Sequence, residues 1–177
     1  KYEEAEPLLI QAVALKPDYI TAHINLGLID QERGEMDSAI NHYRDAIASI
    51  PQDATLREDH LVAYYFLAEA YHLLGRRNDS LDQYEAAART GDHLAEPHYN
   101  LAVKYHEVGR AHEAEIHYRK AAEIRLAYLA AHYGLAAVLA EQGKLDESLA
   151  HLKIVSEYDP QYEQVEQHIE RIEQMLR

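Results

Sequence analysis

Histidine is the residue type in this chain that could most readily do chemistry, because imidazole binds metal ions and titrates near neutral pH. The chain holds 12 histidines. One segment, His112-Glu113-Ala-Glu-Ile-His117, has the residue types of a zinc-protease helix. That motif requires two histidines four residues apart on one helical face, whereas a gap of five rotates the second side chain by about 140°. We therefore expect no zinc catalysis and no metal site.

Other catalytic signatures are missing from the sequence. The chain has no cysteine, which removes thiolate chemistry, disulfides and cysteine-based zinc sites together. It contains neither a glycine-rich phosphate-binding loop nor a G-x-S-x-G nucleophile motif. With 31 aspartate and glutamate residues, carboxylate pairs are common and none stands out. We predict a protein that is not an enzyme and needs no cofactor.

The charge of the chain limits its partners. Its formal net charge is −14, so it lacks the basic face that nucleic acids and anionic membrane surfaces require. No stretch of 18 apolar residues is available for a membrane span. The expected partner is a protein or peptide. The sequence does not fix the compartment, with the cytoplasm slightly favoured.

Four glycines reveal an internal repeat. Gly75, Gly109 and Gly143 follow one another at intervals of 34 residues, and Gly34 precedes Gly75 by 41. Around each glycine the same residue sizes recur in the same order. Eight positions before it is leucine, followed by a small residue: Leu26-Gly27, Leu67-Ala68, Leu101-Ala102 and Leu135-Ala136. After it come a small, a large and another small or medium residue: Ala39, Tyr43, Ala46; Ser80, Tyr84, Ala87; Ala114, Tyr118, Ala121; Ser148, Leu152, Val155.

Helix packing explains this order. Small residues allow two antiparallel helices to approach closely, and large residues fill the adjacent grooves. The glycine takes the left-handed conformation that ends the first helix, and a proline such as Pro51 or Pro160 stops the second. One hairpin cannot bury its apolar face alone, so we expect the hairpins to stack.

A 34-residue period with this order resembles the tetratricopeptide repeat family, over nearly the whole chain. The resemblance implies an all-α fold, a right-handed α-solenoid of helix-turn-helix repeats. The family's aromatic slot in the first helix holds His23, Tyr64, His98 and His132 here, and we interpret its histidines as packing residues. The expected divisions are the second helix of a truncated repeat (1–19), repeats at 20–53, 61–94, 95–128 and 129–162, an insertion at 54–60, and a C-terminal capping helix (163–177).

The two ends of the sequence have separate interpretations. Residues 2–17 carry second-helix spacing without a first helix, and Lys1 is preceded by no methionine or signal-like segment. We therefore expect a fragment of a longer protein. At the other end, Val165, Ile169, Ile172 and Leu176 fall on one stripe of an amphipathic helix.

Two irregularities interrupt the repeat. In the insertion 54–60, Thr55 and Glu58 form a capping box, which predicts that the next helix starts near Thr55; a longer loop is the alternative. Leu126 stands where the family usually has proline. Tertiary packing is expected to keep a turn there. The alternative is a fused helix from about Glu113 to Glu141, which would let two chains exchange their last hairpins as a homodimer.

The resemblance implies that first helices line a concave groove in which partners bind. The groove residues expected here are Asn25, Tyr65, Phe66, Glu69, His72, Tyr99, Asn100, His106 and Tyr133. Tyr65, Tyr99 and Tyr133 recur every 34 residues and would form a ladder, since tyrosine suits protein recognition. The alternative is packing, since the family often has tyrosine in this slot for that purpose. The slots that hold a carboxylate clamp in chaperone-tail binders lack cations: Ile24, Leu28, Phe66, Glu96 and Asn100.

These features predict a protein–protein interaction scaffold whose ligand carries apolar anchors and basic residues. Two alternatives stay open. The chain could be a regulatory or docking arm of a larger enzyme or secretion complex. It could also be a self-assembly module that dimerises by hairpin exchange at the Leu126 junction.

Overall fold

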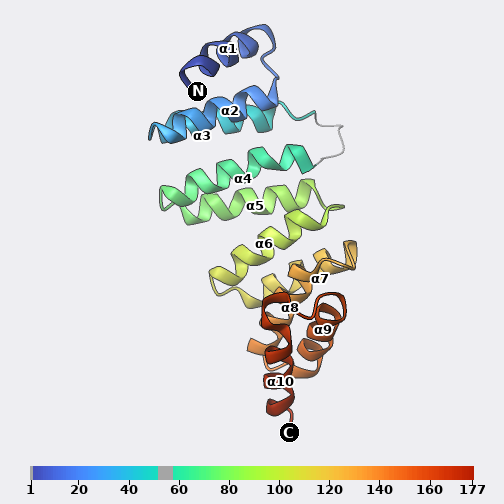
Figure 1. Ribbon diagram of the computed structural model, residues 1–177. Coiled ribbons are helices and arrows are strands. Elements are labelled where there is room, and N and C mark those ends of the chain that lie inside the picture. Colours follow the sequence, from blue (N-terminus) through green and yellow to red (C-terminus); the bar gives the residue numbers. More distant parts are fainter. Residues whose placement is uncertain (1, 52–57) are drawn as a thin grey trace. The chain divides into compact units, whose positions relative to one another are not determined.

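The computed structural model describes residues 2–51 and 58–177, and the regular elements there are all helical (Figure 1). The chain divides into two compact units, Lys1–Gly91 (unit 1) and Asp92–Arg177 (unit 2). The helices of unit 1 are α1 (Tyr2–Leu15), α2 (Ile20–Glu32), α3 (Met36–Ala48), α4 (Glu58–Leu73) and α5 (Arg77–Thr90). The helices of unit 2 are α6 (Ala95–Glu107), α7 (Ala111–Ile124), α8 (Leu129–Glu141), α9 (Leu145–Tyr158) and α10 (Val165–Met175), with a 3-10 turn at Tyr162–Gln164.

Consecutive helices pair as hairpins that stack within each unit. In unit 1, α2 packs against α3 and α4 against α5, while α1 covers α2 and α3 contacts α4. In unit 2, α6 pairs with α7 and α8 with α9, while α7 contacts α8 and α10 covers α9. The predicted all-α fold of stacked helical hairpins is confirmed.

Glycine ends the first helix of each hairpin. Gly34, Gly75, Gly109 and Gly143 have φ values between +71° and +80°. Residues with a Cβ rarely adopt this left-handed region, which glycine enters at little steric cost. The expected left-handed turns are confirmed, and they reverse the chain so that each second helix returns along the first.

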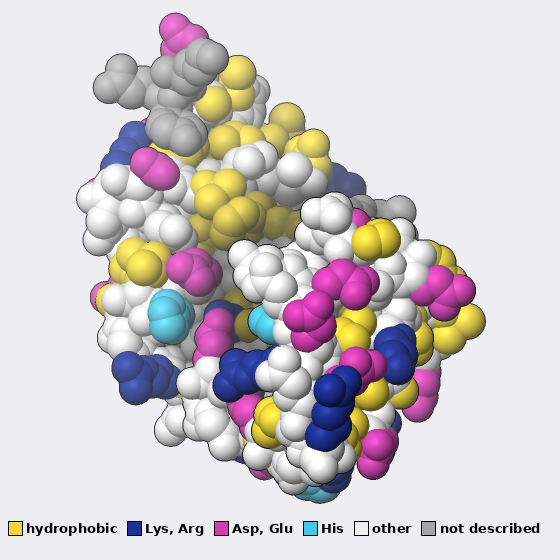
Figure 2. Space-filling view, turned by 60° about the horizontal axis from the view of Figure 1, so that its bottom comes forward, with side chains coloured by type: hydrophobic (Ala, Val, Ile, Leu, Met, Phe, Trp, Pro, Cys, Tyr) yellow, Lys and Arg dark blue, Asp and Glu magenta, His cyan; other side chains and the backbone are white. Residues whose placement is uncertain are grey.

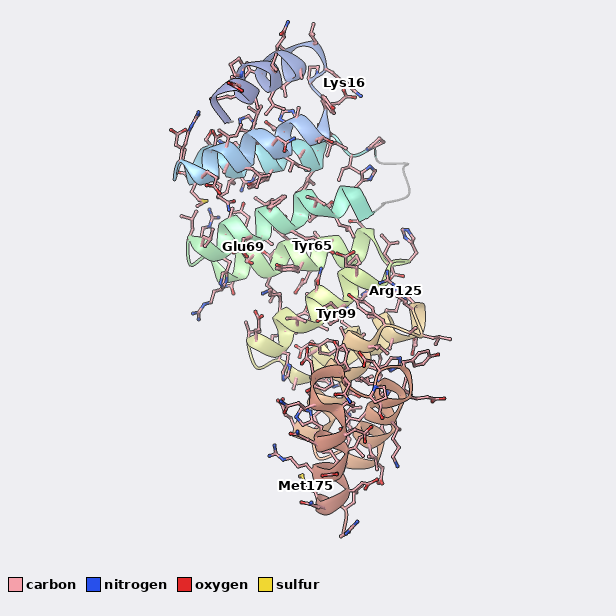
Figure 3. All side chains as sticks on the ribbon, in the orientation of Figure 1. Lys16, Tyr65, Glu69, Tyr99, Arg125 and Met175 are labelled. Atoms are coloured by element: carbon pink, nitrogen blue, oxygen red, sulfur yellow. The ribbon has the colours of Figure 1, made fainter. Side chains whose placement is uncertain are left out.

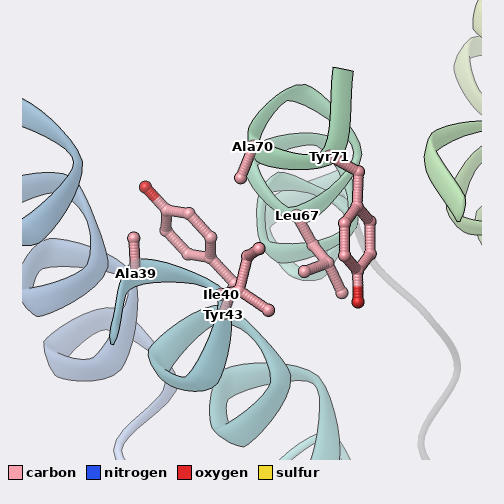
Figure 4. Close-up of a cluster of buried hydrophobic side chains, with 6 residues drawn as sticks. All are labelled: Ala39, Ile40, Tyr43, Leu67, Ala70 and Tyr71. Carbon is pink, nitrogen blue, oxygen red and sulfur yellow. The ribbon is translucent and has the colours of Figure 1, made fainter. Parts of the chain in front are cut away.

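The small-residue positions lie at the centre of the packing. Ala39, Ala46, Ala114, Ala121 and Ser148 are each 0% exposed. In unit 1, Ala39, Ile40 and Tyr43 of α3 meet Leu67, Ala70 and Tyr71 of α4 in one buried cluster (Figure 4). The residues that define the repeat in the sequence therefore form the seams within and between hairpins.

Two helical glycines make room for tyrosine rings. A Cβ added at Gly27 would lie 2.5 Å from Cε1 of Tyr43, and one added at Gly134 would lie 2.6 Å from Cε1 of Tyr118. Both rings are almost completely buried, at 0% and 3% exposure. Glycine is therefore required at these helical positions by close packing, in spite of its poor helix propensity.

The junction at Leu126 is a turn. Helix α7 ends at Ile124, Arg125 is extended (φ −129°, ψ 94°), and α8 begins at Leu129. The fused helix from Glu113 to Glu141 is therefore wrong, and hairpin exchange through it loses its structural basis. The turn is held by His132, whose ring Nε2 lies 2.9 Å from the carbonyl oxygen of Leu126.

The same arrangement occurs at Pro17, which occupies the matching position in the first junction. His23 places its Nε2 2.8 Å from the carbonyl oxygen of Pro17, six residues earlier, as His132 does at Leu126. A histidine in the first helix therefore closes the turn whether or not the turn contains proline. The predicted helix start near Thr55, within the insertion 54–60, lies outside the described residues.

The C-terminal helix is amphipathic, as expected. Val165, Ile169 and Ile172 are buried, at 0%, 9% and 6% exposure, whereas Leu176 lies beyond the helix and is 42% exposed. Among the described helices, none combines the length and apolar character that crossing a membrane requires.

Substitution of Gly134 by alanine tests the close packing against Tyr118. Overpacking of a buried site costs about 1–3 kcal/mol, whereas alanine is better than glycine in a helix by about 1 kcal/mol. We expect Gly134→Ala to lower the free energy of unfolding, measured by urea denaturation. The control is Ala137→Gly at an exposed position of α8, which should lose only the propensity difference. A more stable Gly134→Ala variant would contradict the packing argument.

Leu126→Pro tests whether the turn is already compatible with proline. Arg125 has the extended conformation that residues preceding proline prefer, and Leu126 is 73% exposed. We expect the variant to gain about 0.4–1 kcal/mol in free energy of unfolding, because proline restricts the unfolded chain. Its solution mass, measured by light scattering, should equal that of the wild type. A dimeric wild type that becomes monomeric on this substitution would restore the exchange hypothesis.

Candidate partner-binding surface

In unit 1, the predicted groove residues lie on α2 and α4. Asn25 is half-buried on α2. On α4, Tyr65 is half-buried, and Glu69 and His72 are exposed; Tyr65 and Glu69 are labelled in Figure 3. Phe66 is already engaged in packing, because its ring stacks on Tyr43 of α3 with centroids 5.6 Å apart and planes 18° apart. Only the more exposed of these side chains are therefore available to a partner.

In unit 2, tyrosines from successive elements gather into one cluster. The ring of Tyr99 on α6 lies 5.0 Å from that of Tyr128 and 6.0 Å from that of Tyr118, centroid to centroid. Tyr133 on α8 meets Tyr162 edge-on, with centroids 5.5 Å apart. We call Tyr99, Tyr128, Tyr133 and Tyr162 the tyrosine face; each is only partly buried.

The hydroxyl groups of the tyrosine face stay protonated at neutral pH. Burial raises the pKa of Tyr128 to about 12, assisted by the nearby Tyr99 and Glu96. Burial and the charge of Glu163 raise the pKa of Tyr99 and Tyr133 in the same direction. The hydroxyls of Tyr99 and Tyr128 therefore offer hydrogen-bond donors beside apolar rings.

Helix α10 covers part of the predicted site. The Tyr133 hydroxyl lies 2.8 Å from Nδ1 of His168 and donates to the carbonyl oxygen of Glu163 at 3.2 Å. Its ring also stacks on that of His168, with centroids 5.6 Å apart. The C-terminal cap thus holds Tyr133 as a packing residue of α8, which favours the packing role for this position.

A pocket of about 400 Å³ lies between α8, α9 and α10. Ala136, Ala140 and Leu152 form part of its apolar wall, with Met175 from the C-terminal end of α10. Charged groups also line it, including Glu141 and Arg171. Apolar walls combined with a few polar groups are typical of sites that take an apolar anchor.

His106 and Glu141 are joined within unit 2. Nε2 of His106 lies 3.0 Å from both carboxylate oxygens of Glu141, so the imidazole donates to the carboxylate. Asn100 is half-buried on the same first helix as His106. Because Tyr65 belongs to unit 1 whereas Tyr99 and Tyr133 belong to unit 2, the three-rung tyrosine ladder stays a prediction.

The structure also shows histidine pairs that the sequence analysis missed. In three hairpins, the histidine of the first helix faces another histidine nineteen residues later on the second helix. The pairs are His23 with His42, His98 with His117, and His132 with His151. The constant spacing was visible in the sequence, but the sequence analysis did not relate the two members of each pair to one another.

Hydrogen bonds define the protonation of the two pairs in unit 2. Nδ1 atoms lie 3.1 Å apart between His98 and His117, and 3.0 Å apart between His132 and His151. Since Nε2 of His132 donates to the carbonyl of Leu126, its Nδ1 must accept in the neutral form. His151 therefore donates through Nδ1, and a second proton on the pair would place two N–H groups against each other.

Burial disfavours protonation of one ring in each of these pairs, His98 and His151. Burial, with the adjacent His132 and Arg119, lowers the pKa of His151 to about 4. The pKa of His98 is also lowered by burial, although the carbonyl and carboxylate of Asp92 oppose the shift. On the face displayed in Figure 2, acidic side chains lie among those of lysine and arginine.

Models of the tetratricopeptide repeat match residues 61–86, 95–128 and 129–153. No curated protein matches the chain by sequence.

Solved structures provide three informative comparisons, and at these identities the likeness concerns the fold alone. The chain is 20% identical to MamA, with a TM-score of 0.66, covering 88% of this chain and 87% of MamA. It is 22% identical to YrrB, a repeat protein with an unusual peptide-binding site, with a TM-score of 0.67 and coverage of 89% and 77%. It is 18% identical to the first repeat domain of Spaghetti, bound to an HSP90 peptide, with a TM-score of 0.62 and coverage of 69% and 97%.

Acid should destabilise the fold through His151. In the unfolded chain a histidine titrates near pH 6.5, whereas the pKa of folded His151 is about 4. Between these values the unfolded state binds more protons, so the free energy of unfolding falls as the pH falls. In urea denaturation from pH 7 to pH 4.5, we expect His151→Gln to lose less stability than the wild type. The exposed His112→Gln is the control, and equal pH dependence in wild type and His151→Gln would exclude this source.

Proposed function

The chain belongs to the tetratricopeptide repeat family, and we propose that it is a protein–protein interaction scaffold that binds a peptide or a segment of a partner protein. The observation that carries this proposal is the tyrosine face of unit 2 next to the pocket between α8, α9 and α10. Amphipathic aromatic side chains beside an apolar pocket are the features from which interaction hot spots are built.

The chemistry of the surface favours a particular ligand. The tyrosine hydroxyls are neutral donors, which suits the backbone carbonyl groups of an extended peptide. In unit 1 the exposed Glu69 adds negative charge, and in unit 2 Glu141 does so beside the pocket. The proposed ligand therefore carries an apolar anchor with basic residues near it, in keeping with the net charge of −14.

The similarity to the Spaghetti domain does not extend this ligand class to an acidic chaperone tail. That domain is bound to the HSP90 peptide SRMEEVD. Here the slots expected to receive a terminal carboxylate hold Ile24, Leu28, Phe66, Glu96 and Asn100, none of them cationic. Phe66 is also occupied by its stack on Tyr43. We propose a ligand of the opposite charge.

Helix α10 divides the fourth hairpin's surface between packing and binding. It contacts Tyr133 through His168, while Glu163 of the preceding 3-10 turn accepts from the Tyr133 hydroxyl. The helix also contributes Ile172 and Met175 to the pocket. An apolar ligand side chain would therefore enter beside the cap, between α8 and α10, rather than replace it. The half-buried Asn100 remains available on α6.

Selection from a random-sequence peptide display library tests this proposal with a defined probe. We expect enriched peptides to combine bulky apolar residues with lysine or arginine. The dissociation constant of a selected peptide, measured by fluorescence anisotropy, should rise at least tenfold for Ala137→Glu, which places a carboxylate in the pocket wall. It should rise severalfold for Glu141→Gln, with a weaker dependence on salt.

The matched control is Ile116→Ala, which removes an exposed hydrophobic side chain from the second helix α7. Its affinity should equal that of the wild type, and circular dichroism should show an intact helical fold in every variant. Selected peptides that are acidic, or whose affinity falls with Ile116→Ala but not with Ala137→Glu, would overturn the proposed surface.

A further inference from the structure

The first hairpin brings together three side chains whose atoms commonly bind metal ions. His23 lies on α2, and His42 and Asp45 lie one helical turn apart on α3. One potential ligand atom from each lies within 4.8 Å of those from the other two. Atoms bound tetrahedrally to zinc at about 2.1 Å are about 3.4 Å apart, so small side-chain rotations would bring the three around one ion.

Hydrogen bonding indicates which nitrogens of the two rings are left to bind a metal ion. Nε2 of His23 is held by the carbonyl oxygen of Pro17 at 2.8 Å, and Nε2 of His42 faces Oδ2 of Asp30 at 3.6 Å. The Nδ1 atoms of both rings are buried and have no hydrogen-bond partner. His23 as a whole is only 5% exposed. A buried nitrogen without a partner costs desolvation free energy, which a metal ion would offset.

The other two histidine pairs differ at these points. Their Nδ1 atoms bond to each other at 3.1 Å and 3.0 Å, and their ring centroids are 5.3 Å and 5.2 Å apart, against 5.8 Å for His23 and His42. The position of Asp45 is taken by Lys120 in one and Ile154 in the other. Only the first pair therefore combines two partnerless Nδ1 atoms with a carboxylate.

We propose that His23, His42 and Asp45 form a binding site for a divalent transition metal of the zinc class. Imidazole suits zinc, nickel and copper, and a carboxylate can complete such a set. Three protein ligands leave a further coordination position for water or for a donor from a partner. Asp45 is exposed and His42 is half-buried, which gives the ion a path from solvent.

Outer hydrogen bonds orient the two rings for this role. Metal-binding histidines usually donate their other N–H to a carbonyl or carboxylate, which fixes the tautomer. The Pro17 carbonyl does so for His23. The Asp30 carboxylate faces His42 and is itself positioned by Ser38, whose hydroxyl donates to it at 2.5 Å. A bound ion would join α2 to α3 and stabilise the first hairpin.

Zinc titration of the whole chain tests this site. After treatment with a chelator, isothermal titration with Zn²⁺ at pH 7.5 should show one site per chain. We expect at least tenfold weaker binding for His42→Gln and for Asp45→Asn. The second variant changes an exposed side chain and keeps its shape, so it should fold normally. Binding should weaken as the pH falls, because protons compete with the metal ion for its ligands.

The matched controls come from the other pairs. His117→Gln and His151→Gln should bind Zn²⁺ with wild-type affinity. With Co²⁺, both of these variants should show a visible absorption band, and the Asp45→Asn variant should show none. The proposal is overturned if wild type binds no Zn²⁺ at micromolar concentrations, or if all four variants bind equally. Neither outcome bears on peptide binding, which involves other surfaces.

Discussion

The structure depends on the close approach of two helices in each hairpin, at positions that carry little more than a methyl or hydroxymethyl group. Ala39, Ala114 and Ser148 are completely buried there, and the Ser148 hydroxyl donates to the carbonyl oxygen of Ala136 on the facing helix at 2.7 Å. A larger side chain would push the helices apart and leave the neighbouring Tyr43 or Tyr118 without its fitted space. Because every hairpin repeats this seam, the surfaces that the first helices present depend on it.

The sequence was sufficient to predict this seam because residue size and glycine conformation are backbone constraints that leave a periodic signal. The turn at Leu126 was harder to predict, since no residue within it breaks a helix. It is decided by His132, whose ring reaches the Leu126 carbonyl from the following helix, as His23 reaches Pro17. A hydrogen bond of this kind lies outside local propensity, although the equal spacing of the two residues in both junctions would have suggested it.

The candidate site was less predictable because the same side chains can serve packing or binding. Phe66 and Tyr133 occupy groove positions, yet one stacks on Tyr43 and the other meets His168 of the capping helix. Which role a ring takes depends on its neighbours, and those come from distant parts of the chain. The histidine pairs show the same limit: their members are nineteen residues apart, and only the fold reveals whether the two nitrogens bond to each other or stay without partners.

Polar side chains, as well as apolar contacts, set the register between neighbouring hairpins of unit 2. Glu115 of α7 is only 7% exposed, and it accepts from Arg119 at 2.9 Å and from Lys144, next to α9, at 2.7 Å. Burial alone would raise the pKa of this carboxyl, but the hydrogen bonds from Lys144 and Arg119 lower it to about 2. A buried charge that loses its partners is strongly destabilising, so sliding α9 by one turn would cost far more than repacking alanines and leucines. These charge contacts therefore favour one alignment of the α8–α9 hairpin against α7. The pocket between α8, α9 and α10 depends on that alignment.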